Sequence, residues 1–399
     1  MSEPMSELVC FNDAIILAGD DLQVIIGQSL LVKGGRIVRI GEPDLSASQV
    51  SLGNKILCPM FINAHIHIGD TGAKELGIGL PLEKAVIPPD GLKHRFLQSV
   101  SGTEAHINMM RDGLLELLHN GIIAMADFRE QGLPGVRALR QAAKDLPLHV
   151  IALGRMDESG ADEQIEAEAH LLLQEADGLG IRDIESYPSE LMKRLRKSYP
   201  NKIFAAHAAE NINSEMKSRN RTGMGQTARL LEWQPDFLVH LIHVLPDELQ
   251  RLSDAGIIAV ACPRCNGILG SGQPKLAEWS KCGLHFALGT DNVMFSSPDM
   301  MREMDYASRM VRGQEQDAAA LEPRLLLQAA TIEGARALRL EKELGSLSPG
   351  KESSFIAFDL ESPNLKYQQN VISGIVHRAT PADIAGIYVK GARIPDLIQ

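Results

Sequence analysis

The sequence predicts an α/β protein, a distorted (β/α)8 TIM barrel with a small composite β domain built from the N- and C-termini. Three observations predict this fold. Short apolar runs typical of buried strands alternate with longer amphipathic stretches, strand-like segments stand at both ends, and polar residues follow several of the apolar runs. Alternation of strands and helices favours a parallel sheet covered by helices. A length of 399 residues suits one barrel with an appended domain.

The two ends of the chain are expected to form the small β domain. The N-terminal part contains alternating, β-branched segments separated by glycine-containing turns, VCFNDAIILAG, VIIGQSLLVKGGRIVRIG and NKILC. Near the other end, a helical stretch and a Gly/Pro turn precede two further strand-like segments, FIAFDL and IAGIYVKGARI. We therefore predict a composite β-sandwich-like domain from residues 1–58 and 345–399.

Residues 59–344 are expected to form the barrel. Its strands are interpreted as seven apolar runs, LCPMFINAH, GIIAMADF, LHVIALGR, KIFAAHAAE, DFLVHLIHV, GIIAVACP and LHFALGTD. Amphipathic stretches between them, such as GTEAHINMMRDGLLELLHN and PSELMKRLRKSY, are interpreted as helices. Because the active site of such a barrel lies at the carboxyl ends of its strands, the polar residues that follow these runs are the candidates for chemistry.

Charge and composition exclude several classes of protein. The net charge of −11 argues against a nucleic-acid partner, which requires a basic face. The longest apolar runs fall short of the roughly 20 residues that span a membrane, and the N-terminal MSEPMSEL lacks the apolar segment of a signal peptide. Five scattered cysteines are expected to be free thiols in a reducing cytoplasm. A cytoplasmic protein without a membrane partner is therefore expected.

Two histidines at the end of the first run, His65 and His67, are the first candidates to bind a metal ion. Residues two apart on a strand point to the same side, so both imidazoles face one way. His207 follows another apolar run and offers a third nitrogen, and Asp291 offers a carboxylate at the end of HFALGTD. Each residue alone has a structural alternative, a core histidine or, for Asp291, the N-cap of the following helix.

Proton transfer adds further candidates. Glu210 comes three residues after His207, where a carboxylate can take a proton from water and return it to a leaving group. A solvated loop acid is the structural alternative. His240 and His243 fall on opposite sides of a strand, so one is expected to face the barrel, and the residues alone do not say which. One metal site explains all these residues, whereas the structural alternatives require several independent coincidences.

The pair Cys262 and Cys265 has C-x-x-C spacing, but no second pair completes a structural zinc site. The proline between the two cysteines, and the Ala-Ala-Glu after His207, also depart from the H-x-E…P-C-x-x-C signature of the zinc-dependent nucleobase deaminases. We interpret this segment as the end of a strand.

With these residues assembled, the chain resembles the amidohydrolase superfamily over nearly its whole length. It is most similar to the branch of cytosine deaminase, guanine deaminase, the S-adenosylhomocysteine/methylthioadenosine deaminases and the triazine chlorohydrolases. PMFINAHIH is similar to the family's PGFINxHxH, HAAE to HxxE, CPRCN to CPxSN, GTDN to GTD, and GSLSPGKESSFIAFDLESPN to GxLxPGKxADLVxxDxxxPN. Met60 and Cys265 depart from the usual Gly and Ser, and the segment after His67 does not resemble the HTHLPMxxxRG of the nucleoside deaminases.

The resemblance implies a role for each residue. One divalent metal ion, usually zinc and sometimes iron, would be bound by His65, His67, His207 and Asp291. Glu210 would shuttle protons, and Asp291 would also act as a base on the water. The family's spacing between its strand-end histidine and the Cys-Pro pair selects His240 over His243 to polarise the attacked centre. A second metal is not expected, because EADGLGIRDI offers no lysine to bridge it.

The activity that the resemblance implies is hydrolytic deamination of an aminated heterocycle, such as a purine nucleoside, a pyrimidine or a pterin-like ring, by metal-activated water. The alternatives are a cyclic amidase, a triazine-type chlorohydrolase, and a non-catalytic scaffold or metal-binding protein. Arg129 and Arg155 each follow a predicted strand and are candidates to bind an anionic part of the substrate, as is His243 for substrate contact. Salt bridges to Glu130 or Asp157 are the structural alternative for the arginines. The protein is expected to act on a small molecule and to form a homo-oligomer, a dimer or larger.

Overall fold

The computed structural model describes residues 7–158 and 160–395. Contacts divide the chain into two compact units. One unit comprises Asn63–Leu114 and Ala124–Pro298, and the other comprises the remaining described residues. The domain boundaries expected from the sequence, at 58/59 and 344/345, stay a prediction.

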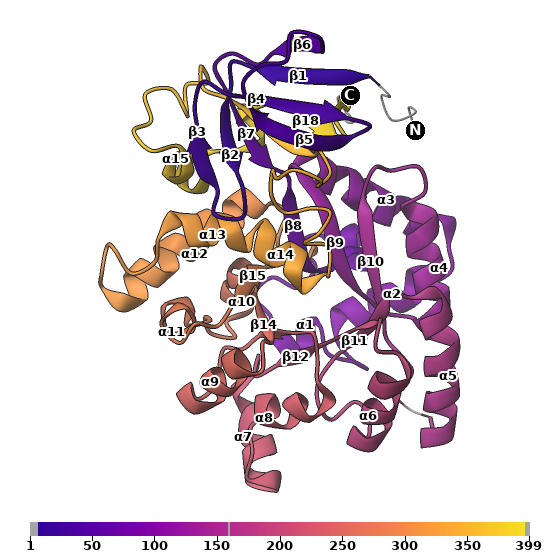
Figure 1. Ribbon diagram of the computed structural model, residues 1–399. Helices are drawn as coiled ribbons and strands as arrows, with labels where there is room; N and C mark the ends of the chain where they lie inside the picture. The colour runs from indigo at the N-terminus through magenta and orange to yellow at the C-terminus, as the bar shows by residue number, and fades with distance from the viewer. Residues whose placement is uncertain (1–6, 159, 396–399) are drawn as a thin grey trace. The chain divides into compact units, whose positions relative to one another are not determined.

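Within the described residues, the largest sheet runs in the order β15-β14-β13-β12-β11-β10-β9-β8-β16 (Figure 1). Its strands are β8 (Phe61–His67), β9 (Ile122–Arg129), β10 (His149–Gly154), β11 (Gly178–Ile181), β12 (Ile203–Ala208), β13 (Phe237–His240), β14 (Ile258–Ala261), β15 (Phe286–Leu288) and β16 (Asp291–Asn292). The ladders from β9 to β15, and the ladder between β16 and β8, are parallel.

The ends of this sheet are joined by one short segment. β15 and β16 stand at opposite ends of the strand order, yet only Gly289 and Thr290 separate them in sequence. The backbone N–H of Gly289 donates to Ala261 O at 2.9 Å, and that of Thr290 donates to His65 O at 3.0 Å. The segment therefore hydrogen-bonds to β14 and to β8, the strands next to the two ends of the strand order, and closes the sheet into the distorted (β/α)8 barrel that the sequence predicts.

The barrel strands are buried along their length because they are covered on both faces. Every residue of β8, β9 and β12 is buried, as expected for parallel strands between a barrel interior and a helix layer. The predicted helix PSELMKRLRKSY is confirmed as α6 (Ser189–Ser198), which buries Leu191, Met192 and Leu195 along one face and carries basic residues in its last turn.

The other helices that cover or cap the barrel strands are η1 (Ile68–Ala73), α1 (Leu82–Ala85), α2 (Leu92–Val100), α3 (Glu104–His119), α4 (Gly132–Ala142), α5 (Asp162–Glu175), α7 (Ile212–Thr222), α8 (Gln226–Leu230), η2 (Leu231–Trp233), α9 (Pro246–Asp254), α10 (Pro263–Leu269) and α11 (Leu276–Lys281). The C-terminal part adds α12 (Met300–Glu315), α13 (Pro323–Ala329), α14 (Ile332–Ala337), α15 (Val371–Arg378) and η3 (Pro381–Asp383). Among the helices of residues 7–158 and 160–395, none has the length and apolarity needed to cross a membrane.

Two further sheets confirm the composite β domain. One has the order β5-β4-β1-β6 and the other the order β19-β18-β17-β7-β2-β3. Their strands are β1 (Leu8–Asn12), β2 (Ile15–Ala18), β3 (Gln23–Ile25), β4 (Ser29–Lys33), β5 (Arg36–Gly41), β6 (Ser48–Ser51), β7 (Lys55–Pro59), β17 (Phe355–Asp359), β18 (Ile384–Val389) and β19 (Ala392–Arg393). β17 pairs antiparallel with both β7 and β18, so strands from the two ends of the chain share one sheet. Figure 1 shows them together in indigo and yellow.

Candidate functional site

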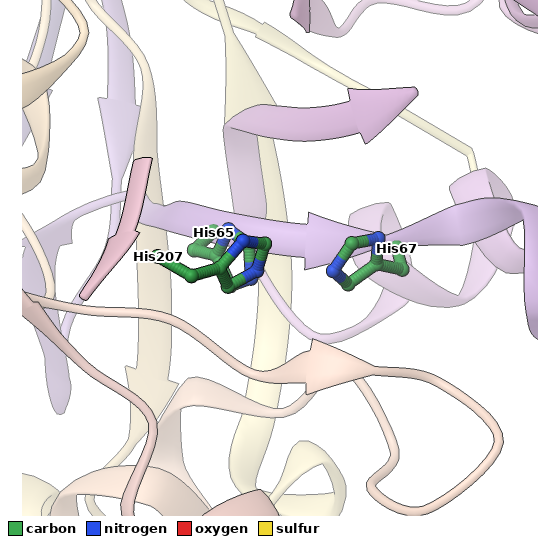
Figure 2. Close-up of side chains that lie close together, drawn as sticks. All are labelled: His65, His67 and His207. Atoms are coloured by element: carbon green, nitrogen blue, oxygen red, sulfur yellow. The ribbon is translucent and has the colours of Figure 1, made fainter. Parts of the chain in front are cut away.

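Three histidines converge at the carboxyl ends of two barrel strands. His65 and His67 lie on β8 and His207 lies on β12, and Figure 2 shows their imidazoles gathered in one place. The ring centroid of His65 is 5.0 Å from that of His67 and 4.9 Å from that of His207. One ring nitrogen of each lies within 4.8 Å of the others, a spacing that can hold a metal ion.

A carboxylate completes this cluster. Asp291, on β16, places Oδ1 3.3 Å from His65 Nε2 and 3.5 Å from His67 Nε2. Burial alone would raise the pKa of Asp291, but its contact with His65 and its electrostatic interactions with the imidazoles of His65, His240 and His67 outweigh burial and hold that pKa well below the usual range. The residue has a positive φ of 59°, an unusual backbone conformation for a non-glycine residue, of the kind that clusters at functional sites.

The ring protons of two histidines are placed by backbone carbonyls. His67 Nδ1 lies 3.2 Å from Phe128 O, and His207 Nδ1 lies 3.1 Å from Ile181 O. Each Nδ1 therefore carries the proton, and Nε2 keeps a lone pair for a metal. Burial lowers the pKa of both rings, that of His67 to about 4, so both are neutral near pH 7, the form that binds a metal.

His65 gives the clearest sign that a cation belongs here. Its side chain is fully buried, and among the described residues neither ring nitrogen makes a hydrogen bond, although Nε2 lies 3.3 Å from Asp291 Oδ1. Burying a polar group without a partner costs free energy, on the order of 1–3 kcal/mol. A bound cation would supply the missing partner, so the residues present fit a divalent metal ion.

Glu210 lies beside the cluster, just beyond the end of β12. Its Oε2 is 3.7 Å from His240 Nε2, and the residue lines the cavity in front of the histidines. Burial raises the pKa of Glu210 to about 8, and the nearby charge of Asp291 adds to the shift. A carboxyl group tuned toward neutral pH is suited to giving and taking a proton.

Of the two histidines that the residues alone left open, His240 faces the site. It ends β13, and its ring centroid is 5.3 Å from that of His207. His243 does not line the cavity, and its Nε2 contacts Ser271 O at 3.0 Å. The strand ends at His240, so the strand alternation used to compare the two positions does not extend to His243.

Asn266 is a site residue that the sequence analysis missed. It lies on α10, within the CPRCN segment, and its Nδ2 is 3.0 Å from His240 Nδ1. An amide N–H can only donate, so His240 Nδ1 accepts and Nε2 carries the ring proton. His240 thus presents a donor to the cavity, in contrast to the lone pairs of the other histidines. The CPxSN resemblance marked this segment, but not the contact.

Loss of the Asn266 amide is expected to weaken His240 as a hydrogen-bond donor. In Asn266→Ala the ring is free to change tautomer and to rotate, so we expect kcat to fall by about 10- to 100-fold, the loss typical when a group that orients a site histidine is removed. Metal content should stay at the parental level, because His240 presents an N–H rather than a lone pair. Steady-state kinetics and metal analysis of the same preparation check this. A parental kcat would contradict the assigned tautomer.

Three more residues missed by the sequence analysis, Lys93, Glu130 and Asn292, adjoin the cluster of histidines and Asp291. The Nζ of Lys93, on α2, lies 2.8 Å from Glu130 Oε1 and donates to Asn292 Oδ1 at 2.7 Å. Glu130 Oε1 also lies 2.8 Å from His67 Nδ1. The position of Glu130 directly after a predicted strand was a usable signal, because strand ends carry the other site residues. Lys93 lies on a helix, outside any pattern that points to the site.

The two arginines expected to bind substrate lie in different surroundings. Arg129 is fully buried, does not line the cavity, and contacts Asp127 at 3.2 Å and Glu130 at 2.6 Å. Arg129 therefore forms salt bridges, which was its structural alternative, and the two arginines do not line the cavity together. Arg155 does line the cavity, and its Nε is buried with no hydrogen-bond partner among the described residues.

The site opens into a cavity of about 560 Å³. Its apolar lining residues include Leu82, Val86, Ile87, Leu97, Pro134 and Met156. Its charged lining residues include Arg155, Glu158 and Arg182. A cavity with apolar walls and a few converging polar groups is typical of a small-molecule site.

Comparisons with known proteins found a matching family model and similar relatives. The model of the amidohydrolase family matches residues 56–394. A putative aminohydrolase of Methanothermobacter thermautotrophicus is 36% identical over 295 residues, 72% of this chain and 76% of the relative. The 5-methylthioadenosine/S-adenosylhomocysteine deaminase of Thermoanaerobacter pseudethanolicus is 22% identical over 415 residues, 96% of this chain and 92% of the relative.

Solved structures share the fold. An adenosine deaminase from Xanthomonas campestris with bound zinc has a TM-score of 0.83 at 20% identity, covering 98% of this chain and 93% of that one. Atrazine chlorohydrolase from Arthrobacter aurescens, complexed with zinc, has a TM-score of 0.81 at 19% identity, covering 96% and 94%. The distorted barrel with its composite β domain is therefore an arrangement found in metal-containing hydrolases.

Proposed function

Because the chain belongs to the amidohydrolase family, we propose that it is a hydrolytic deaminase of an aminated heterocycle that works with one zinc ion. The observation that carries the proposal is the convergence of His65, His67, His207 and Asp291 beside Glu210 at one end of a small-molecule cavity. The names of the aminohydrolase and deaminase relatives support deamination over the other reactions expected from the sequence.

The proposed metal ligands are His65, His67, His207 and Asp291. The buried, unpartnered nitrogens of His65 favour a cation among them. When bound, such a cation would lower the pKa of a coordinated water toward about 7 and polarise the reacting centre. Zinc is proposed because it is bound in the solved adenosine deaminase and atrazine chlorohydrolase. A single ion is proposed because β11 offers no lysine side chain to bridge a second one.

The chain's own residues would move the protons of the reaction. Water adds to the ring carbon that carries the amino group, and Asp291 accepts a proton from that water. Glu210, whose pKa burial raises to about 8, gives its proton to the ring nitrogen next to this carbon. His240 donates its Nε2–H to the oxygen that adds. Glu210 then takes the proton of the added hydroxyl and passes it to the amino group, which leaves as ammonia as the carbon–nitrogen bond breaks, and the proton held by Asp291 restores Glu210.

Ammonia release is the test of this function. The zinc-loaded protein is offered amino-purines, amino-pyrimidines, pterins and adenosine-type nucleosides, and ammonia is measured together with the keto product. A stoichiometric yield of both supports the proposal. Release of chloride from a chlorotriazine would contradict deamination and indicate a chlorohydrolase. Formation of a carboxylate from a cyclic amide would indicate a cyclic amidase. A protein without bound metal and without turnover would favour the scaffold.

Arg155 is proposed to bind an anionic or strongly polar group of the substrate in the cavity. Its position at the end of β10 and its unpartnered Nε support this role. Arg129 is not part of the proposal, because its charges are already neutralised by buried carboxylates. The expected cytoplasmic location and homo-oligomeric state stay predictions.

Replacing Arg155 with methionine keeps most of the apolar stem and removes the charge. We expect KM to rise by about 10- to 100-fold with kcat nearly unchanged, because a charge-assisted hydrogen bond contributes about 1.5–3 kcal/mol to binding and the proposed contact is to a part of the substrate that does not react. Steady-state kinetics on the identified substrate measure both constants. Arg137→Met, an exposed arginine paired with Glu175, is the matched control. An unchanged KM in Arg155→Met would remove the residue from the substrate site.

A further inference from the structure

Lys93 is a buried cation beside the proposed metal ligands. Its side chain is 4% exposed, although it comes from a short helix, α2, that carries exposed residues on its other face. A lysine ammonium is almost never buried unless it is paired, because removal from water is costly. Here it has carboxylate and amide oxygens around it, with Glu130 Oε1 at 2.8 Å, Asn292 Oδ1 at 2.7 Å and Asp70 Oδ2 at 3.6 Å.

One chain of contacts, or arm, runs from Lys93 through Asn292 to Asp291. An ammonium group has donors and no acceptor, so Asn292 must turn its carbonyl oxygen toward Lys93. The amide nitrogen of Asn292 then faces the other way, where it donates to Asp291 Oδ1 at 2.8 Å. That oxygen is the one that lies near the Nε2 atoms of His65 and His67. Lys93 therefore fixes which end of the Asn292 amide meets the carboxylate.

The other arm runs from Lys93 through Glu130 to His67. Glu130 Oε1 lies 2.8 Å from both Lys93 Nζ and His67 Nδ1, while Oε2 of the same carboxylate contacts Arg129 Nη2 at 2.6 Å. A carboxylate held on both oxygens by two cations is fixed in place, and its negative charge beside His67 Nδ1 favours the proton there, which Nδ1 donates to Phe128 O. Groups of this kind orient metal-ligating histidines and raise their affinity for the metal.

We propose that Lys93 is a positioning residue of the metal site, which holds the carboxylate of Asp291 through Asn292 and the imidazole of His67 through Glu130. The two proposed ligands come from the last and first strands of the barrel, and one ammonium group sets the orientation of both. This inference rests on the proposed metal site, but it does not depend on which heterocycle is the substrate.

The test measures zinc binding without substrate. Lys93→Met replaces the ammonium with an apolar side chain of similar length. We expect its zinc affinity, measured by competition with a chromogenic chelator, to fall by about 10- to 100-fold, as is usual when a group that orients a ligand is lost. At saturating zinc, kcat should be lower and KM within about threefold of the parent, since the change acts on orientation rather than on substrate binding. Arg95→Met, an exposed cation on the same helix, is the matched control and should keep the parental affinity.

Chemical rescue separates positioning from a general effect on packing. In Lys93→Ala, ethylammonium should restore zinc affinity because Lys93 lines the cavity and a small amine can enter it. Ethanol and choline at the same concentration should not. Rescue by ethanol as well would mean that filled volume, not charge, is what the site needs, and the proposal would fail.

Other outcomes are equally decisive. A folded Lys93→Met protein with parental zinc affinity overturns the proposal, as does one in which only KM rises, which would make Lys93 a substrate contact. Should Lys93→Met not fold, Asn292→Ala removes one arm and leaves the pair with Glu130, and an unchanged zinc affinity in that variant also overturns the proposal. A parental protein that fails to bind zinc contradicts the proposed metal site itself, so the two failures are distinguishable.

Discussion

Replacing Glu210 with glutamine is expected to lower kcat by about 100- to 10,000-fold, the range that a positioned proton donor contributes. Glutamine has nearly the same shape, but it can neither give a proton to the ring nitrogen nor take one from water. Glu210 lies beyond the ligand cluster, with its Oε2 3.7 Å from His240 Nε2. Bound zinc should therefore stay at the parental level while turnover is lost. Ammonia release under single-turnover conditions, with metal analysis of the same sample, measures both.

Glu163→Gln, at an exposed position on α5, is the control for the loss of one carboxylate and should keep the parental kcat. A Glu210→Gln variant that turns over at more than a tenth of the parental rate would show that another group moves the protons. Loss of zinc together with activity would instead place Glu210 among the ligands. Both results would require a different assignment of the site.

Removing a proposed ligand is expected to abolish activity and metal binding together. In His207→Ala the cluster loses one of three neutral imidazoles whose ring nitrogens converge, and the remaining groups bind a cation far more weakly. We expect zinc below one tenth of an equivalent after gel filtration, and turnover below detection. Inductively coupled plasma mass spectrometry and the ammonia assay on the same fractions test this result.

Two comparisons complete the experiment. His119→Ala removes an exposed histidine from α3 and should leave both quantities unchanged. Parental protein stripped with a chelator should lose activity and regain it when zinc is returned, whereas His207→Ala should not regain it. An active and fully metallated His207→Ala protein would exclude this histidine from the metal site.

Much of the fold could be predicted because apolar periodicity reports burial directly. The exception is β11, which was not among the seven apolar runs. Its sequence, GLGI, carries two glycines where strands usually carry β-branched residues. A Cβ at Gly178 would lie 1.8 Å from Ile203 O, and one at Gly180 would lie 2.7 Å from the ring of Phe128. The neighbouring strands approach β11 so closely that these two positions have no room for a side chain. A single sequence does not reveal this close approach.

The predicted site residues came from one rule, that polar groups at strand ends gather at one face of a barrel. That rule found the three histidines, Glu210 and Asp291, which the structure brings together. It could not find Lys93 or Asn266, because both reach the site from helices. It also could not distinguish Arg129 from Arg155, since the decisive neighbour of Arg129 is Asp127, whose own side chain is fully buried.

The segment between β15 and β16 has a consequence for how this protein acquires its activity. Asp291 directly follows the segment Gly289–Thr290, which connects the strands at the two ends of the sheet. Gly289 approaches β8 so closely that an added Cβ would lie 2.8 Å from His65 Cβ. Asp291 reaches the histidines where β16 pairs with β8, so the proposed set of four ligands is complete only when the ring of strands is closed. Since a ligand stabilises whichever state binds it best, a metal ion bound by these proposed ligands would stabilise the closed ring.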